Sequence, residues 1–395
     1  MSSAPVIDEV TSVSNERARA RLLVCLPSFS AEARQAALGA LAEALPNERV
    51  LIASPEERIN AGGEIEGVAY SSPRGSLSWT LAAADYVAAM SVAAQHEVEE
   101  VLVLGQEAIG AVALRALIAT LRAGTCDVVL PRFSLRPHEG LVNGAILYPL
   151  TRALYADVRF PLAPHAALSR RAVERFGTVA QRLAGGGHAD ALLWPVAEAA
   201  QGGLVLRQAE AGSRVLPHPD DEEFNALFAA VAGSMFADIE AKASFWQRAR
   251  TFAPAAPRAL SQSPEPADDV RAMVESYRLA YANLHELWSL VLPPQTLLAL
   301  KKLSLAEPAK FAIAPSLWAR IVSDFVLGYH VRTINRGHLL GAFTPLYLAW
   351  VASFARATDN ETGLAATFME QTAAAFEMEK PYLVARWRWP DRFNP

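Results

Sequence analysis

Short apolar runs alternate with stretches of helical periodicity through the first 130 residues. The runs are residues 22–26, 50–53, 101–104 and 128–130, and the helical stretches between them are residues 31–45, 77–94 and 109–122. Runs of this length are typical of buried strands, whereas apolar positions three or four residues apart are typical of helices. Strands that alternate with helices predict an α/β fold, in which helices cover both faces of a mostly parallel sheet.

The middle of the chain continues the mixed pattern: we expect helices at residues 169–176 and 189–199, a strand at 204–209 and a long helix from 222 past 246. The last third is entirely helical, with helices expected at residues 269–291, 295–303, 315–330, 338–357 and 361–379. Residues rich in proline, serine and alanine precede this helical part and are typical of a linker. We therefore predict a loose arm (1–20), an α/β domain (21–251), a linker (252–268) and a helical C-terminal domain (269–395).

The composition is that of a globular protein with a large core. Of the 395 residues, 52% are hydrophobic and 19% are charged. The net charge of −5, with no dense run of Lys or Arg, excludes a nucleic-acid footprint. Cys25 and Cys126 are the two cysteines, and both lie in or beside apolar runs. They predict reduced, buried thiols in a cytoplasmic protein, and they are too few for a cysteine-based metal site.

No segment predicts export or a membrane span. Residues 1–10 lack the basic start and apolar centre of a signal peptide. Residues 339–355 are the most apolar window, but they contain Pro345 and fall short of the roughly 20 residues that cross a bilayer. We expect this window to be a buried helix.

The segment from Leu130 to Ser169 carries the most specific pattern. Pro131 follows an apolar run, a polar loop leads into a helix that contains Tyr148, Pro149 and Leu150, and the segment leaves through Pro161. This order resembles the retaining family 2-type glycosyltransferases that make glucosylglycerate and mannosylglycerate. Residues 318–325, 344–354 and 381–387 are similar to the helical C-terminal part of that group.

The resemblance implies a fold, an activity and partners. The fold would be GT-A, the Rossmann-like fold of nucleotide-diphospho-sugar transferases, followed by an all-helical domain. The activity would be the transfer of a hexosyl group from UDP- or GDP-hexose to a small polar acceptor with retention, using Mg or Mn. In open α/β sheets ligands bind beyond the carboxyl ends of the strands, so the loops after Leu26, Ala53, Leu104 and Leu130 are the first candidates.

On the donor side the match to the group is partial. Pro27 and Ser28 fit the group's strand end, whereas Ser54 and Glu56 stand where the group has an acidic base-binding loop. Arg74 is suited to a diphosphate, although a surface arginine explains it equally well.

The loop after residues 101–104 lacks the Asp-x-Asp pattern that holds the cation in the group. Glu107, with the amide of Gln106, follows the strand instead, and it either holds a cation or simply begins the next helix. His218 with Asp220 and Asp221 either completes a metal site or caps a helix N-terminus.

The acceptor side departs as well. Asn143 alone remains polar where the group has two threonines, and His165 replaces the carboxylate of a Gly-Gly-acid turn. Tyr329 and Arg332 belong to the densest polar cluster of the helical domain and complete the acceptor candidates.

Two functions follow from this combination of a matching scaffold and altered polar residues. The chain is either a glycosyltransferase or a catalytically inactive homologue that acts as a binding, regulatory or assembly partner. A nucleotidyltransferase on a similar sheet would need a Gly-rich basic loop after the first strand, which this sequence lacks. The sequence leaves homo-oligomerisation open.

Overall fold

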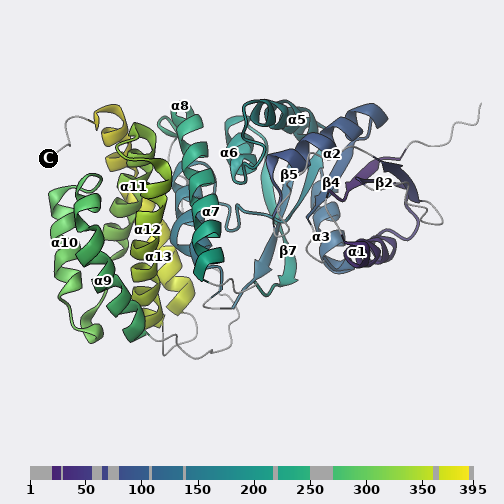
Figure 1. The fold of residues 1–395 in the computed structure, drawn as a ribbon. Helices are drawn as coiled ribbons and strands as arrows, with labels where there is room; N and C mark the ends of the chain where they lie inside the picture. Colours follow the sequence, from purple (N-terminus) through teal and green to yellow (C-terminus); the bar gives the residue numbers. More distant parts are fainter. Residues whose placement is uncertain are drawn as a thin grey trace, which may run out of the picture.

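A seven-stranded sheet forms the centre of the first half of the chain (Figure 1). The computed structural model describes residues 20–27, 30–55, 65–69, 80–105, 109–136, 139–216, 221–249, 270–358 and 364–390. The strands are β1 (Leu22–Cys25), β2 (Val50–Ser54), β3 (Ile65–Ala69), β4 (Glu100–Leu104), β5 (Val128–Ser134), β6 (His165–Ser169) and β7 (Leu206–Ser213). Their order is β3-β2-β1-β4-β6-β5-β7, and β6 alone runs antiparallel to its neighbours.

Helices cover both faces of this sheet. Leu23 and Cys25 pack with α2 (Ala83–His96), α5 (Arg170–Gly185) and α6 (Trp194–Gln201), whereas Leu22 and Val24 pack with α1 (Ala31–Ala44) and α3 (Ala111–Arg122). This alternation follows from the period-two geometry of a strand, which sends successive side chains to opposite faces. The central strand β1 (LLVC) is apolar at every position because both of its faces are buried, whereas the edge strand β7 is polar and mostly not buried.

The rest of the chain is a helical assembly beside the sheet (Figure 1). Its elements are a π-helical turn η1 (Asn143–Leu147), α4 (Tyr148–Leu154), α7 (Asp221–Ala241), α8 (Ala243–Trp246), α9 (Val270–Ser289), α10 (Pro294–Ser304), a 3-10 turn η2 (Pro308–Lys310), α11 (Pro315–Val331), α12 (Arg336–Thr358) and α13 (Leu364–Arg388). One apolar core joins η1, α4 and α7 to the C-terminal helices. The Trp318 indole donates to the carbonyl of Ala145 at 2.8 Å inside this core.

Two described helices are long and apolar enough to cross a membrane by composition, namely residues 223–241 of α7 and α12. The most apolar window of α12 is 78% buried within the protein, and that of α7 is 33% buried. The buried position of α12 agrees with the buried helix expected for residues 339–355.

The α/β class is confirmed, with a mostly parallel sheet followed by helices. The structure differs from expectation in several places: β3, β6 and η1 were not predicted, α2 begins at Ala83 rather than at residue 77, and the long helix expected from residue 222 past 246 ends at Ala241, before the short α8. The start of α2 is fixed by Asp85, whose carboxylate accepts from the Ala82 N–H at 2.8 Å. Residues 1–19 and 250–269 lie outside the described residues, so the arm and the linker stay predictions. The core shared by α7 and the C-terminal helices crosses the predicted domain boundary.

Candidate functional site: the carboxyl edge of the sheet

Six strands end at one edge of the sheet, which we call the carboxyl edge. β6 begins there because it is antiparallel, and its first residue, His165, pairs with Leu104, the last residue of β4. Pro27 lies just beyond β1 and is buried, and Ser54 ends β2 with 2% of its surface exposed. The structure therefore places Pro27, Ser54 and His165 at the same edge.

Gly105 brings the loop before β6 against the end of β4. Its N–H donates to the carbonyl of Pro164 at 2.8 Å, and the Thr80 hydroxyl donates to the carbonyl of Ala163 at 3.3 Å. A Cβ atom on Gly105 would lie 2.6 Å from the Pro164 carbonyl oxygen, closer than real Cβ contacts. Glycine at 105 is thus required by the close approach of two backbone segments.

We expect Gly105→Ala to lower the free energy of unfolding by roughly 1–3 kcal/mol, because the new methyl group forces two backbone segments apart. Gly110→Ala is the matched control, since a Cβ there meets no atom within 4 Å. Denaturant unfolding of both variants checks this prediction. Equal stability of the two variants would show that the Pro164 loop gives way without cost.

His165 is fully buried, and its ring lacks the hydrogen bonds that a buried polar side chain normally makes. It is 0% exposed, and neither ring nitrogen has a hydrogen-bond partner among the described residues. Burial and, to a smaller extent, the positive charge of Arg214 together lower the pKa of His165 to about 3. The imidazole is therefore neutral near pH 7, with one ring N–H to donate and one nitrogen to accept.

The burial of His165 predicts a loss of stability in acid. Its folded pKa lies below the unfolded value of 6.5, so the stability present above pH 6.5 is lost as the pH falls towards 3. We expect this group to remove about 2 kcal/mol between pH 6.5 and pH 5, and His165→Leu to abolish that loss. Unfolding of both proteins at pH 7.5 and pH 5 gives the difference, with the exposed His188→Leu as the control. An unchanged pH dependence in His165→Leu would contradict the assignment.

Arg214 contributes positive charge to the same edge. Its backbone N–H donates to the carbonyl of Ser134 at 3.1 Å, which continues the pairing of β7 with β5. Its guanidinium carbon lies 5.2 Å from the centre of the Phe133 ring. The edge therefore presents a neutral imidazole within the field of a guanidinium.

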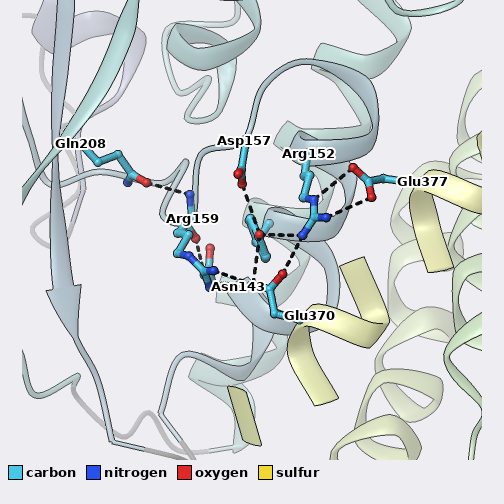
Figure 2. Close-up of polar contacts among 8 residues, drawn as sticks. Asn143, Arg152, Asp157, Arg159, Gln208, Glu370 and Glu377 are labelled. Carbon is cyan, nitrogen blue, oxygen red and sulfur yellow. Dashed lines mark hydrogen bonds and ion pairs between the residues drawn. The ribbon is translucent and has the colours of Figure 1, made fainter. Parts of the chain in front are cut away.

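Asn143 belongs to a network of hydrogen bonds and ion pairs around α4 and α13 (Figure 2). Its amide donates to the carbonyl of Arg159 at 2.8 Å, and the Arg159 N–H donates to the Gln208 side chain of β7 at 2.8 Å. The side chain of Asn143 thus holds the loop after α4.

Two arginines of this network are paired with carboxylates from α13 (Figure 2). Arg152 donates to both oxygens of Glu377 at 3.0 and 3.1 Å and to Glu370 at 2.7 Å. The Arg159 guanidinium pairs with the other oxygen of Glu370 at 2.6 Å. α13 is therefore bound to α4 and to the loop that follows it by two carboxylates.

Tyr329 and Arg332 lie at the opposite end of α7 from the carboxyl edge. Arg336 stacks over Tyr329, with its guanidinium carbon 3.9 Å from the ring centre, and pairs with Glu240 at 2.6 Å. Glu240 is 19 residues beyond the start of α7, or about 28 Å at 1.5 Å per residue. Arg332 takes a left-handed conformation (φ 59°) and ends α11. The structure does not bring this pair to the edge that holds His165.

No protein-family model and no curated protein sequence matches the chain. Solved structures are similar to it at low identity. Glucosyl-3-phosphoglycerate synthase from Mycobacterium tuberculosis, in complex with Mn²⁺, UDP and glucosyl-3-phosphoglycerate, is 14% identical, with 62% of this chain and 84% of that chain covered at a TM-score of 0.36. Mannosyl-3-phosphoglycerate synthase from Rubrobacter xylanophilus is 17% identical, with 61% and 81% covered at a TM-score of 0.37.

The chain is similar in structure to this synthase group. The group is the one that residues 130–169 resemble. The strand order, in which β6 is the single antiparallel strand among the described strands, is that of the mostly parallel α/β sheet expected from the sequence. At TM-scores of 0.36 and 0.37 the likeness assigns no role to any residue of this chain.

The described residues do not form a cation site of the kind that the synthase group implies. Across the nine described ranges, no group of three or more His, Cys, Asp or Glu side chains is arranged to hold a metal. Ser28, Glu56, Arg74, Glu107 and His218, which include both cation candidates, lie outside the described residues. They stay predictions.

Sequence reasoning missed Gly105 and the Arg152 network. The sequence did carry a signal for Gly105, because this glycine follows a buried strand at the place where the synthase group has its Asp-x-Asp loop. Arg152 gave no signal, because an arginine on a short helix is usually exposed.

Proposed function

We propose that this chain binds a nucleoside-diphosphate hexose at the carboxyl edge and transfers the hexosyl group to a small polar acceptor with retention. One observation carries the ligand site: His165 is buried, neutral and without a partner among the described residues, at the edge where six strands end. A buried polar group without a partner costs free energy, and a bound ligand that satisfies it removes that cost. The donor class comes from the resemblance and from the synthases, whose structures hold UDP.

Arg214 and His165 suit the diphosphate end of such a donor. A guanidinium offers several N–H donors to phosphate oxygens, and a neutral imidazole adds one more. UDP- and GDP-hexoses are the donor candidates, and Mg or Mn belongs to the proposal through Glu107 and His218. A cytoplasmic location stays part of the proposal.

Calorimetric titration tests the proposal. The protein is titrated with UDP, GDP and their glucose and mannose conjugates, with and without Mn²⁺, and any positive case is repeated with His165→Leu and Glu107→Ala. His188→Leu is the control, since His188 is exposed in the turn after α5. We expect His165→Leu to weaken binding at least tenfold, the loss of about one hydrogen bond in a buried site. Absence of binding for all four ligands at millimolar concentration would contradict the donor site.

A second function has its own supporting observation. Asn143, an acceptor-side candidate, and Arg152 and Arg159 of the same segment are all engaged inside the protein. A chain whose acceptor-side asparagine maintains its own fold is suited to a non-catalytic role as a binding, regulatory or assembly partner. Donor binding without transfer to any acceptor, including 3-phosphoglycerate, would favour this second function.

A further inference from the structure

Helix α6 lies between the sheet and the helical assembly (Figure 1). Its Trp194 and Val196 belong to the core that covers one face of the sheet, whereas Ala197 belongs to the core of the helical assembly. The start of α6 is tied to α7 by Ser234, whose hydroxyl accepts from the Leu192 N–H at 2.8 Å. The contact between α6 and α7 therefore joins the two halves of the molecule.

The other end of α6 is tied to α7 by the side chain of Lys242. Its ammonium group pairs with Glu198 and donates to the side-chain oxygen of Gln201 at 2.8 Å. The Arg175 guanidinium also pairs with Glu198, at 2.5 Å. Lys242 is 7% exposed and Glu198 is 0% exposed, so this pair is held away from water. Buried ion pairs depend strongly on the charges around them, because water does not screen them.

The helix is interrupted at the same lysine. The apolar pattern predicts one helix from residue 222 past 246, but Lys242 takes a non-helical conformation (φ −104°, ψ 17°) between α7 and α8. The Trp246 indole of α8 donates to the carbonyl of Ile239, in the last turn of α7, at 2.8 Å. Lys242 thus lies at a break between two helices rather than within one.

Asp238 competes for the ammonium group of Lys242. It lies one helical turn before the lysine, since the Lys242 N–H donates to the Asp238 carbonyl at 3.0 Å. Side chains four residues apart are neighbours on a helix and pair when their charges are opposite. The Oδ2 atom of Asp238 is nevertheless buried without a hydrogen-bond partner among the described residues. Lys242 therefore has two carboxyl groups within reach and is bonded to the one on α6.

The surroundings of Asp238 keep its carboxyl group neutral below about pH 7. Burial raises its pKa from 3.8 to about 7, the charge of Lys242 acts against this shift, and the charge of Glu198 adds to it. The Tyr155 hydroxyl, at the end of α4, faces the same carboxyl group and can donate to its ionised form. Asp238 therefore changes its charge near neutral pH.

The other helices that pack against α7 direct their charges elsewhere. His330 of α11 and Arg336 of α12 both face Glu240, at 3.0 and 2.6 Å. Glu240 is two residues beyond Asp238, so the two side chains point to different sides of α7. The charge of Asp238 is thus decided by the groups of α4, α6 and α7.

We propose that Asp238, Lys242 and Glu198 form a pH-dependent latch between the sheet and the helical assembly. While Asp238 keeps its proton, Lys242 bonds to α6 and holds its end against the break between α7 and α8. When Asp238 gives its proton to solvent, its carboxylate draws the ammonium group into an i, i+4 pair and the end of α6 is released. Glu198 stays paired with Arg175, so the released state leaves no charge of the latch without a partner. This latch is independent of the function proposed above.

Hydrogen exchange of the full chain at pH 6, 7 and 8, corrected for the intrinsic pH dependence of exchange, tests the latch. Asp238 changes from about one-tenth to about nine-tenths ionised over this range. We expect peptides that cover residues 196–203 and 238–249 to lose about tenfold in protection from pH 6 to pH 8, while α3 stays unchanged. Asp238→Asn should keep the protection of pH 6 throughout, whereas the exposed Asp190→Asn should behave as the wild type. Unchanged protection in the wild type, or an equal loss in Asp238→Asn, would overturn the proposal.

Two further variants test the parts played by Lys242 and Glu198. Lys242→Met removes the tie, so the same peptides should exchange at pH 6 as fast as those of the wild type at pH 8. Glu198→Gln removes the charge that opposes ionisation of Asp238, so the midpoint of the transition should move about one pH unit lower. Wild-type protection at pH 6 in Lys242→Met, or an unmoved midpoint in Glu198→Gln, would contradict the latch.

Discussion

Replacing Arg152 by methionine is expected to lower the free energy of unfolding by about 3–5 kcal/mol, because in a buried site it removes the cation that pairs with Glu377 and leaves Glu370 with Arg159 alone. The Arg152 side chain is 3% exposed, and Glu370 and Glu377 are 16% and 11% exposed. Methionine keeps the apolar packing of the arginine stem but removes the guanidinium. Urea unfolding followed by far-UV circular dichroism measures the difference.

Two further variants separate the buried charge from a general effect of mutation. Arg170→Met removes an exposed i, i+4 pair with Glu174 and should cost less than about 1 kcal/mol. Arg152→Met combined with Glu370→Gln and Glu377→Gln removes the uncompensated charges and should recover at least half of the loss. A loss below 1 kcal/mol in Arg152→Met would show that α13 is held to α4 by apolar packing alone.

Asp238→Asn is expected to change the pH dependence of stability by about 3 kcal/mol between pH 5 and pH 8. Burial raises the pKa of Asp238 from 3.8 to about 7, against the attraction of Lys242 and with the repulsion of Glu198. A carboxyl group with a raised folded pKa contributes stability that is fully present below pH 3.8 and is lost as the pH rises through 7. Relative to the wild type, the asparagine variant should therefore gain stability as the pH rises.

The surroundings of Asp238 explain why the ionised form of its carboxyl group is unfavourable. Lys242, which faces it, already pairs with Glu198, and the Arg175 guanidinium pairs with the same carboxylate at 2.5 Å. The Oδ2 atom of Asp238 has no hydrogen-bond partner in the described part of the chain. Unfolding of wild type and variant at pH 5, 6.5 and 8 measures the effect, with the exposed Asp190→Asn as the control. Parallel pH curves for wild type and Asp238→Asn would contradict it.

The apolar pattern was enough to predict most of the sheet and the helical part. Strands buried on both faces, such as β1 and β4, are continuous apolar runs that local sequence identifies. β6 escaped prediction because it is short, begins with a histidine and is stabilised by pairing with two distant strands. The turn η1 escaped because its geometry depends on the packing of Trp318 and α13.

Only part of the site was predictable, because the rest depends on contacts between residues that are far apart in the sequence. The strand ends predicted the edge where Pro27, Ser54 and His165 lie, since parallel strands end together. The use of Arg152 inside the fold depends on Glu370 and Glu377, more than 200 residues away. Tyr329 could not be placed, because no local pattern tells which end of a helical assembly a loop occupies.

Hydrogen exchange measured by mass spectrometry, with and without UDP-glucose or GDP-mannose in the presence of Mn²⁺, tests whether the ligand site is the carboxyl edge. We predict slower exchange on ligand binding in peptides that cover residues 22–27, 50–55, 100–105 and 163–169, and unchanged exchange in α9 to α11. Protection confined to the C-terminal helices, with these four segments unchanged, would contradict the account.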